Sequence, residues 1–256
     1  MFKAKSITAS ILIVWCCLPL LLLLFLSFSI NYAFPQLLPT NFTIQHWVYF
    51  LVGNNGLKQS FFNTFIIALL VASTSTVLGF ISSKWIAYNT RKNFWLTLTY
   101  FPFALSPVIF AVCLKFYFLK AGLAGNIGGV ILAQLIITFP YATIFFTNFW
   151  NNSVRNFKNI AATLGSDSLH TYGKVIFPLA KSFLIVCFFQ CFLMSWFEYG
   201  LSSVIGYGKV ETLTIKVFQF IGEANIFYAA LCSCLLIIPP IILLWLNKKF
   251  VLQQSR

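Results

Sequence analysis

Acidic side chains are nearly absent from this sequence, which contains four of them against 17 lysines and arginines. They are Asp167, Glu198, Glu211 and Glu223. No two stand at close spacing, and the two histidines, His46 and His170, lie far apart and are predicted to be solvated polar residues. Enzymes that use a carboxylate pair or a metal cluster need such groups together. The sequence therefore excludes an intramembrane enzyme of these classes, and no metal site is expected.

Phosphate-binding and nucleophile motifs are also missing. The glycines at positions 122, 125, 128 and 129 are not followed by the lysine and hydroxyl residue that a phosphate loop requires, so they indicate a turn. No nucleophile elbow occurs. The chain is therefore expected to hold no ATPase site and no cofactor, and any energy that it uses must come from a partner.

Charge of either sign is scarce, since 8% of the residues are charged and 60% are hydrophobic. Soluble domains carry about 25% charged residues, so the chain is predicted to be an integral membrane protein surrounded by a lipid bilayer. The formal net charge of +13 does not indicate nucleic-acid binding. Its basic residues cluster at the ends of apolar runs and form no continuous stripe.

Six apolar runs come close to the roughly 20 residues that a helix needs to cross a bilayer. They cover residues 7–30, 61–81, 96–118, 127–149, 182–200 and 226–246. The first run is too long for a signal peptide and has no small-residue cleavage site, so it is predicted to be an uncleaved helix. Prolines inside the third, fourth and sixth runs predict bent helices.

The basic residues set the predicted orientation. With the N-terminus inside the cell, twelve of the 17 lysines and arginines fall on the cytoplasmic side and five on the other. Cytoplasmic loops of membrane proteins carry such an excess. Both termini and the stretch from Val154 to Lys181 are therefore predicted to be cytoplasmic.

The stretch from Val154 to Lys181 is predicted to form two short helices with a hinge. Apolar residues recur every three or four positions in its first half, which gives one apolar helix face. They are Val154, Phe157, Ile160, Ala161 and Leu164. Gly165 then ends this helix, because glycine tolerates the left-handed geometry just past a helix C-terminus.

A second helix is expected to begin after the glycine. Ser166 or Asp167 can cap its N-terminus. Its apolar residues are Leu169, Tyr172 and Ile176. Pro178 closes the unit, because proline is accepted in the first turn of a helix but not in its interior.

These residues resemble the cytoplasmic signature of the membrane subunits of binding-protein-dependent ABC importers. That signature is Glu-Ala-Ala, three residues, Gly, nine residues, then Ile-x-Leu-Pro. Counting from Gly165 places Asn159, Ile160 and Ala161 at its first three positions and Val175, Phe177 and Pro178 at the Ile, Leu and Pro positions. The glycine, the proline and one alanine match, whereas the family glutamate is Asn159 here.

Further motifs extend the resemblance over about residues 60–246. They are Asn63-Thr64, Pro102 and Pro107, Pro140-Tyr141, and Trp196-Phe197-Glu198-Tyr199-Gly200 followed by Thr212-Leu213. Each is similar to positions in the subfamily that serves polyamines, ferric iron and thiamine.

The resemblance implies an all-α integral membrane protein with about six transmembrane helices and the type I ABC importer (MetI-like) permease fold. It implies a first helix and extracytoplasmic segment over residues 1–60, a transmembrane core over 61–246 with a cytoplasmic coupling loop at 150–181, and a cytoplasmic tail over 247–256. The chain would lie in a bacterial inner membrane and form half of a translocation pore.

The resemblance also implies partners. They are a cytoplasmic ABC ATPase dimer that binds the ATP, a homologous or identical second permease subunit, and an extracytoplasmic substrate-binding protein. Contact with the ATPase would be made by Val154, Phe157, Asn159, Ile160, Ala161, Leu164, Gly165 and Pro178. The substrate would be a polyamine or another small solute such as iron or thiamine. The alternative is a membrane scaffold or assembly subunit that transports nothing.

The presence of Glu198 in an apolar run requires an explanation, because a charged group at the centre of a membrane helix costs about 2.5–3.5 kcal/mol on insertion scales. It lies twenty residues after Pro178. At about 1.5 Å per residue this is near the outer boundary of the hydrocarbon. Three interpretations stay open: Glu198 lines the translocation path, it caps a helix or pairs with Lys115 or Lys209, or it contacts another subunit.

Overall fold

The structure is a computed structural model that describes residues 2–31, 41–53 and 56–252. Helices form nearly all of the described chain, so the predicted all-α class is confirmed. By packing, the chain divides into two units. Unit 1 contains Met1–Phe62 and Thr212–Pro239, and unit 2 contains Asn63–Glu211 and Pro240–Arg256. The sequence-based division at residues 60 and 246 stays a prediction.

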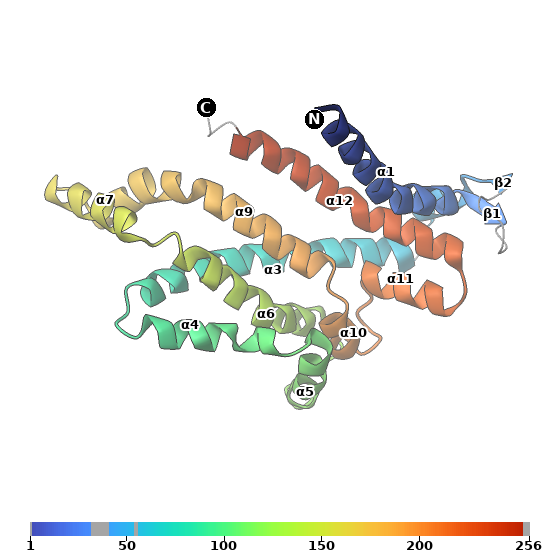
Figure 1. The fold of residues 1–256 in the computed structure, drawn as a ribbon. Coiled ribbons are helices and arrows are strands. Elements are labelled where there is room, and N and C mark those ends of the chain that lie inside the picture. The colour runs from blue at the N-terminus through green and yellow to red at the C-terminus, as the bar shows by residue number, and fades with distance from the viewer. Residues whose placement is uncertain (1, 32–40, 54–55, 253–256) are drawn as a thin grey trace. The chain divides into compact units, whose positions relative to one another are not determined.

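Unit 1 is formed by an N-terminal segment and a C-terminal segment of the chain. It contains α1 (Phe2–Ser27), β1 (Ser29–Asn31), β2 (Asn41–Phe42), α2 (Gln45–Val52), α11 (Leu213–Gly222) and the first half of α12 (Ile226–Leu252), of which all but α2 are labelled in Figure 1. The two strands pair antiparallel. His46 lies on α2 with its ring 4.9 Å from that of Tyr228, and its Nε2 lies 3.2 Å from the Ser29 carbonyl oxygen. His46 is half-buried between these groups, so it is only partly solvated, contrary to the predicted fully solvated residue.

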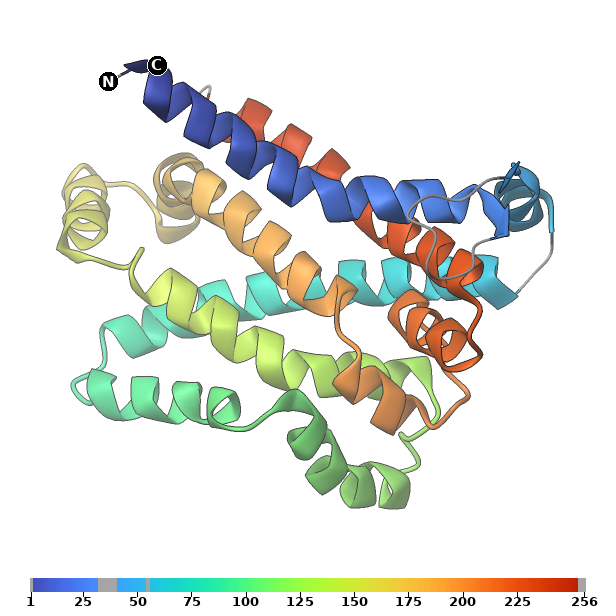
Figure 2. The same ribbon diagram turned by 45° about the vertical axis from the view of Figure 1, so that its right-hand side comes forward.

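Besides the end of α12 from Pro240 on, unit 2 contains most of the described helices. In chain order they are α3 (Gly56–Ala87, from Asn63 on), α4 (Lys92–Tyr100), η1 (Phe101–Ala104), α5 (Pro107–Lys120), α6 (Ile127–Thr147), α7 (Asn152–Thr163), α8 (Ser168–Thr171), the π-helical turn η2 (Tyr172–Ile176), α9 (Phe177–Trp196) and α10 (Gly200–Gly206). Helix α6 packs along α9 and α4, and the short helix α10 packs against α5 and α6 (Figures 1 and 2).

Four of the predicted spans are single helices that are long and apolar enough to cross a membrane. Within the described residues they are Gly56–Ala87, Ile127–Thr147, Leu169–Trp196 and Ile226–Trp245. The first predicted span lies in α1. Helices α6 and α12 continue through Pro140 and through Pro239 and Pro240. The short helices α2, α10 and α11 were not predicted, because their few turns give little periodic signal.

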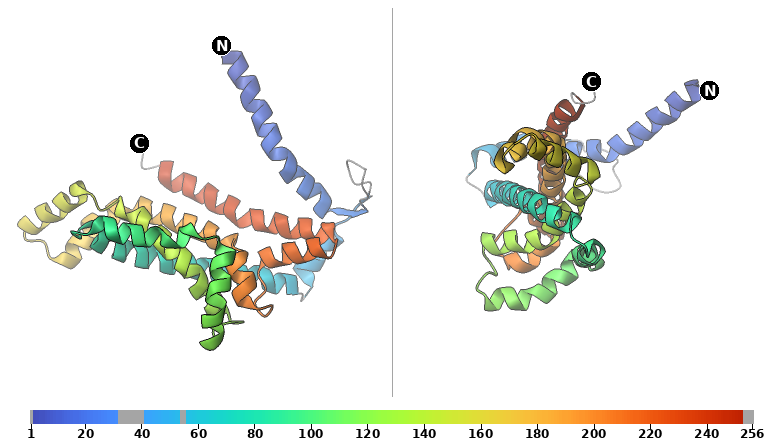
Figure 3. Two further views of the ribbon diagram at one scale, coloured as in Figure 1. Left: turned by 60° about the horizontal axis from the view of Figure 1, so that its bottom comes forward. Right: turned by 90° about the vertical axis from the view of Figure 1, so that its left-hand side faces the viewer.

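The third predicted span is broken. The stretches Lys92–Ala104 and Pro107–Lys120 meet at an angle of 96°, and Figure 3 shows α5 turning away from α4. Proline disfavours helical geometry in the residue before it, and Ser106 before Pro107 is extended, with φ −61° and ψ 139°. The predicted bend is therefore confirmed here, as a break and not a gentle curve.

Helices α3 and α6 approach each other closely at Gly79. A Cβ atom added to this glycine would lie 2.5 Å from the Cβ of Ala142 and 2.9 Å from its carbonyl carbon. Hydroxyl groups bridge the same interface, with 2.7 Å between Ser75 Oγ and Thr138 Oγ1 and 3.1 Å between Ser82 Oγ and Thr143 Oγ1. Small residues and hydroxyl bridges are the usual means of holding helices together in lipid.

We expect Gly79→Ala to destabilise unit 2 by about 1–3 kcal/mol, because the new methyl group overlaps backbone atoms of α6 that must then shift. Gly128→Ala is the matched control, since nothing lies within 4 Å of its added Cβ. Thermal unfolding of both variants in detergent measures the difference. Equal melting temperatures for the two variants would contradict the close α3–α6 approach.

Candidate functional site

The stretch between α6 and α9 begins with a capped amphipathic helix. Asn151 precedes α7 in extended geometry, and its Oδ1 accepts a hydrogen bond from the backbone N–H of Val154 at 3.1 Å. Asparagine is among the preferred N-cap residues, because it satisfies one of the free N–H groups of the first turn. The predicted first helix is confirmed and begins two residues earlier than the apolar pattern.

Gly165 ends this helix as predicted. Its φ angle is +77°, in the left-handed region that favours glycine. The N–H of Gly165 donates to the Ala162 carbonyl at 3.0 Å, and the N–H of Ser166 donates to the Ala161 carbonyl at 3.0 Å. This pair of bonds is a Schellman motif, which satisfies carbonyls that the helix end leaves free.

The second half of the stretch is helical but irregular. Helix α8 is followed by the π-helical turn η2 and then by α9, which has Pro178 in its first turn. A proline ring clashes with the carbonyl four residues before it in a regular α-helix, and here that residue, Lys174, lies in the π-helical turn. Pro178 lies in the first turn of α9 as predicted, but it does not close the second helix, because the helical stretch Leu169–Trp196 continues through it. The π-helical turn was not predicted.

The predicted apolar face of α7 divides into a buried edge and an exposed centre. Val154 is 7% exposed and packs with Phe149, Trp150, Ile176 and Ala180 of its own chain. Phe157, Ile160 and Leu164 are 49%, 55% and 81% exposed. We call these three residues the exposed α7 face. Val154 thus anchors the helix, and the other three leave an apolar surface that the unit itself does not cover.

The remaining predicted coupling residues lie at the surface. Asn159 and Gly165 are exposed, as is Pro178, and Ala161 is half-buried. On a helix, Asn159 stands on the side opposite Phe157 and shares that side with Arg155, four residues earlier. The site is therefore a small helix with one apolar and one polar side at one end of unit 2 (Figure 2).

Glu198 has a structural role. It stands between α9 and α10, where its Oε1 accepts from the N–H of Leu201 at 2.6 Å and its Oε2 accepts from the N–H and the hydroxyl of Ser202 at 2.9 and 2.7 Å. A carboxylate at a helix N-terminus satisfies free N–H groups and interacts favourably with the helix dipole. Of the interpretations left open by the sequence, the structure supplies the helix cap.

A network of buried hydrogen bonds continues from this cap to α6 and α9. Ser202 Oγ accepts from Nε2 of Gln134 at 2.9 Å, and Ser195 Oγ donates to Oε1 of Gln134. Gln134, Ser195 and Ser202 are each at most 3% exposed. Sequence analysis missed Gln134, although a lone amide inside an apolar run was a signal for a required partner. These hydrogen bonds connect α6, α9 and α10.

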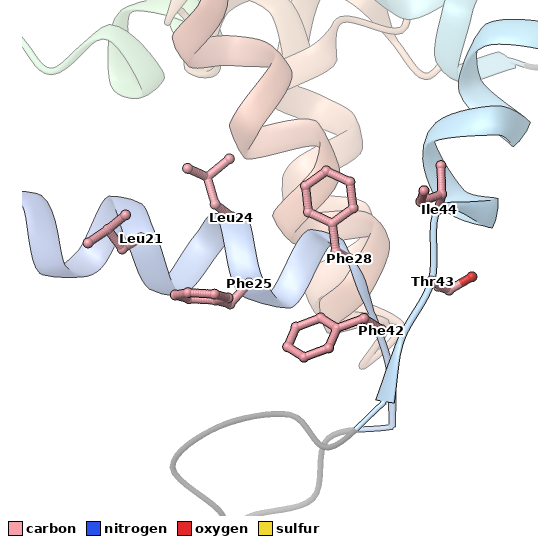
Figure 4. Close-up of a pocket in the computed structure, with 7 residues that line it drawn as sticks. All are labelled: Leu21, Leu24, Phe25, Phe28, Phe42, Thr43 and Ile44. Carbon is pink, nitrogen blue, oxygen red and sulfur yellow. The ribbon is translucent and has the colours of Figure 1, made fainter.

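An apolar groove of about 820 Å³ lies in unit 1. Figure 4 shows its lining, with Leu21, Leu24 and Phe25 on the last turns of α1, Phe28 just after it, and Phe42, Thr43 and Ile44 on β2 and the residues that follow. No titratable side chain is among them. The groove therefore offers no group for chemistry, and its composition suits contact with lipid.

Comparison with known families agrees with this geometry. The family described as "Binding-protein-dependent transport system inner membrane component" matches residues 75–251, more than half of the chain. The chain belongs to this family. It is accordingly a multi-pass membrane permease subunit of an ABC importer, a transport protein and not an enzyme.

Curated relatives of this permease are similar over most of its length. It is 23% identical to the spermidine/putrescine transport system permease protein PotC of Haemophilus influenzae, over 69% of each chain. It is also 23% identical to the putative 2-aminoethylphosphonate transport system permease protein PhnV of Salmonella choleraesuis, over 96% of each chain.

A solved structure has the same fold. It is that of a bacterial ABC transporter involved in the import of the acidic polysaccharide alginate, with a TM-score of 0.67 and 16% sequence identity over 97% of this chain and 95% of that one. The predicted MetI-like importer permease fold is therefore confirmed.

We expect Glu198→Gln to destabilise the permease by about 1–3 kcal/mol, because the amide NH₂ cannot accept a hydrogen bond and leaves a donor of α10 unpaired. Glu223→Gln is the matched control, since Glu223 is an exposed residue that accepts one hydrogen bond, from Gln219 at 2.9 Å. Thermal unfolding in detergent compares the two. A Glu198→Gln variant as stable as the control would show that the cap contributes little.

Proposed function

We propose that this permease forms half of a solute pore and that the exposed α7 face binds a groove on a cytoplasmic ABC ATPase. The observation that carries the proposal is the exposure of Phe157, Ile160 and Leu164 on a helix that is capped at both ends and anchored by Val154. An amphipathic helix outside the lipid needs a partner for its apolar side, and helix-in-groove binding provides one.

Coupling follows from differential binding. A partner moves a pore only if it binds one pore state better than the other. Closure of an ATPase dimer around ATP displaces whatever its groove holds, so a short rigid helix on the permease is a suitable point of transmission. Gly165 fixes the exit from α7, and Pro178 fixes the entry to α9.

The remaining partners and the orientation are part of the same proposal. The basic residues favour a cytoplasmic site for both termini and for α7. The ATP is then bound by the ATPase, a second permease subunit completes the pore, and a binding protein delivers solute from outside. Family membership supports such partners in general.

The substrate that we propose is a small solute, with a polyamine as the first candidate and 2-aminoethylphosphonate as the second, because relatives named for both are similar over most of the chain. Glu198 does not favour a polyamine, since its carboxylate already accepts three hydrogen bonds from α10. Competition of unlabelled putrescine and 2-aminoethylphosphonate against uptake of the labelled compounds distinguishes the two candidates.

A membrane scaffold that transports nothing is the second candidate. It would account equally well for the low intramembrane charge, but it gives no reason for an exposed apolar helix with the importer signature. Co-purification with an ATPase separates the two functions.

We expect Gly165→Asp to uncouple ATP hydrolysis from transport, because aspartate is strained at φ +77° and adds a charge beside the exposed α7 face. The measurement is the ratio of substrate-stimulated to basal ATPase activity in reconstituted complexes. Gly173→Asp is the control, since it adds the same charge at an exposed glycine that does not have a positive φ. Wild-type stimulation in Gly165→Asp would contradict the mechanism.

We expect Leu164→Asp to release the ATPase, because an ionised carboxylate cannot enter an apolar groove without a large desolvation cost. Ala162→Asp, on the polar side of the same helix, is the control and should keep the ATPase bound. The amount of ATPase that co-purifies with each tagged permease gives the answer. Equal recovery with both variants would favour the scaffold.

A further inference from the structure

The cytoplasmic end of α3 contacts residues 150–181, which we call the coupling stretch, through two cation–π contacts. The cation belongs to α3 in one contact and to α7 in the other. The ammonium nitrogen of Lys84 on α3 lies 4.7 Å from the ring centre of Tyr172 in η2. In return, the guanidinium of Arg155 on α7 lies 5.6 Å from the ring centre of Tyr88, just after α3. Both distances are within the roughly 6 Å over which a cation is attracted to an aromatic face.

A buried hydrogen bond lies between these contacts. Nε1 of Trp150, just before α7, donates to Oγ of Ser83 at 3.0 Å. The Trp150 ring also packs against Phe80 and Tyr88, with ring centres 5.0 and 6.3 Å apart. Three residues of the α3 end therefore contact three residues of the coupling stretch. They are Ser83, Lys84 and Tyr88 on one side and Trp150, Arg155 and Tyr172 on the other, and we call them the α3 clamp.

The α3 clamp and the exposed α7 face use different sides of the same helix. Arg155 stands opposite Phe157 on α7, so its contact with Tyr88 leaves the exposed α7 face free. Figure 2 shows that α7, the start of α9 and the α3–α4 turn lie at one end of unit 2. Burial raises the pKa of the Tyr88 phenol, although the charge of Arg155 acts in the opposite direction, so this ring is neutral at physiological pH.

Tyr172 adds a second feature. Its hydroxyl oxygen is buried and has no hydrogen-bond partner, although its ring contacts Lys84. A buried polar group without a partner is rare and unfavourable. The contact of Tyr172 with α3 is therefore made by its ring and not by its hydroxyl. Tyr172 is also the first residue of the π-helical turn, a type of turn that is frequent at functional sites.

We infer that the α3 clamp makes α3 move with α7, so that Lys84, Tyr88, Arg155 and Tyr172 are positioning residues that carry the displacement of the coupling helix into the membrane. This inference rests on the proposed function and adds a route to it. The chain itself connects α7 to α6 and α9, whereas the clamp moves a third span, α3, that is not adjacent in sequence to α7.

The test measures motion of α3 in the complete permease–ATPase complex and needs no substrate. A reporter cysteine is placed at Ile81, which is 63% exposed on α3, after Cys16 and the exposed Cys17 and Cys113 are replaced by serine, and the four buried cysteines are left in place. The labelling rate of Ile81→Cys by a maleimide is compared with and without ATP plus vanadate, which traps the ATPase. We expect a change in rate in the otherwise unmodified complex.

Variants that remove one side of a cation–π contact should reduce this ATP-dependent change at least threefold while the ATPase still co-purifies. They are Arg155→Gln, Tyr88→Leu and Tyr172→Leu. Variants that keep the interaction, Arg155→Lys, Tyr88→Phe and Tyr172→Phe, should keep the change. The exchange Tyr88→Arg with Arg155→Tyr should restore at least half of it. Lys158→Gln removes a neighbouring charge from α7 and is the matched control.

Each other outcome overturns the inference. An unmodified complex with no ATP-dependent change at Ile81→Cys would show that α3 does not follow the ATPase. Loss variants that keep the full change, or an exchange variant no better than the single ones, would show that the cation–π contacts carry nothing. Loss of the ATPase from the Arg155→Gln complex would assign Arg155 to binding instead of transmission. Failure of the proposed function differs from all of these, because then no ATPase co-purifies with the unmodified permease.

Discussion

The packing of Val154 against its own chain fixes the orientation of α7 and so determines which side of this helix is exposed. Val154 is buried among Phe149, Trp150, Ile176 and Ala180, so the helix is fixed to its own chain along one edge. In this orientation of α7, Phe157, Ile160 and Leu164 are exposed to solvent. Because α7 is fixed along one edge, its apolar surface faces outward in one direction. A partner that binds this surface therefore acts on the whole end of unit 2.

The interior of unit 2 is suited to move with that end as one body. Gln134 joins α6 to α9 and α10 through Ser195 and Ser202, and the carboxylate of Glu198 completes the α10 cap. Polar groups in lipid have no water to replace a lost partner, so such bonds resist separation of the helices. Gly79 lets α3 approach α6 at backbone distance. Close-packed interiors of this kind transmit displacement instead of absorbing it.

Local features of the site were predictable from the sequence, whereas contacts between distant segments were not. The apolar period of α7, the left-handed Gly165 and the place of Pro178 each depend on a few neighbouring residues. Tyr172 meets Lys84 across 88 positions, and Gln134 meets Ser202 across 68. No local pattern carries that information. For the same reason Glu198 remained ambiguous, because the helix that it caps is too short to show a period.

The most direct test determines on which side of the membrane the exposed α7 face lies and whether the ATPase covers it. Leu164→Cys, in a background without Cys16, Cys17 and Cys113, is treated with a membrane-impermeant maleimide in vesicles of known orientation. The account predicts labelling only in inside-out vesicles, and slower labelling when the ATPase is bound. Labelling of Leu164→Cys from the outside, or an unchanged rate with the ATPase bound, would contradict it.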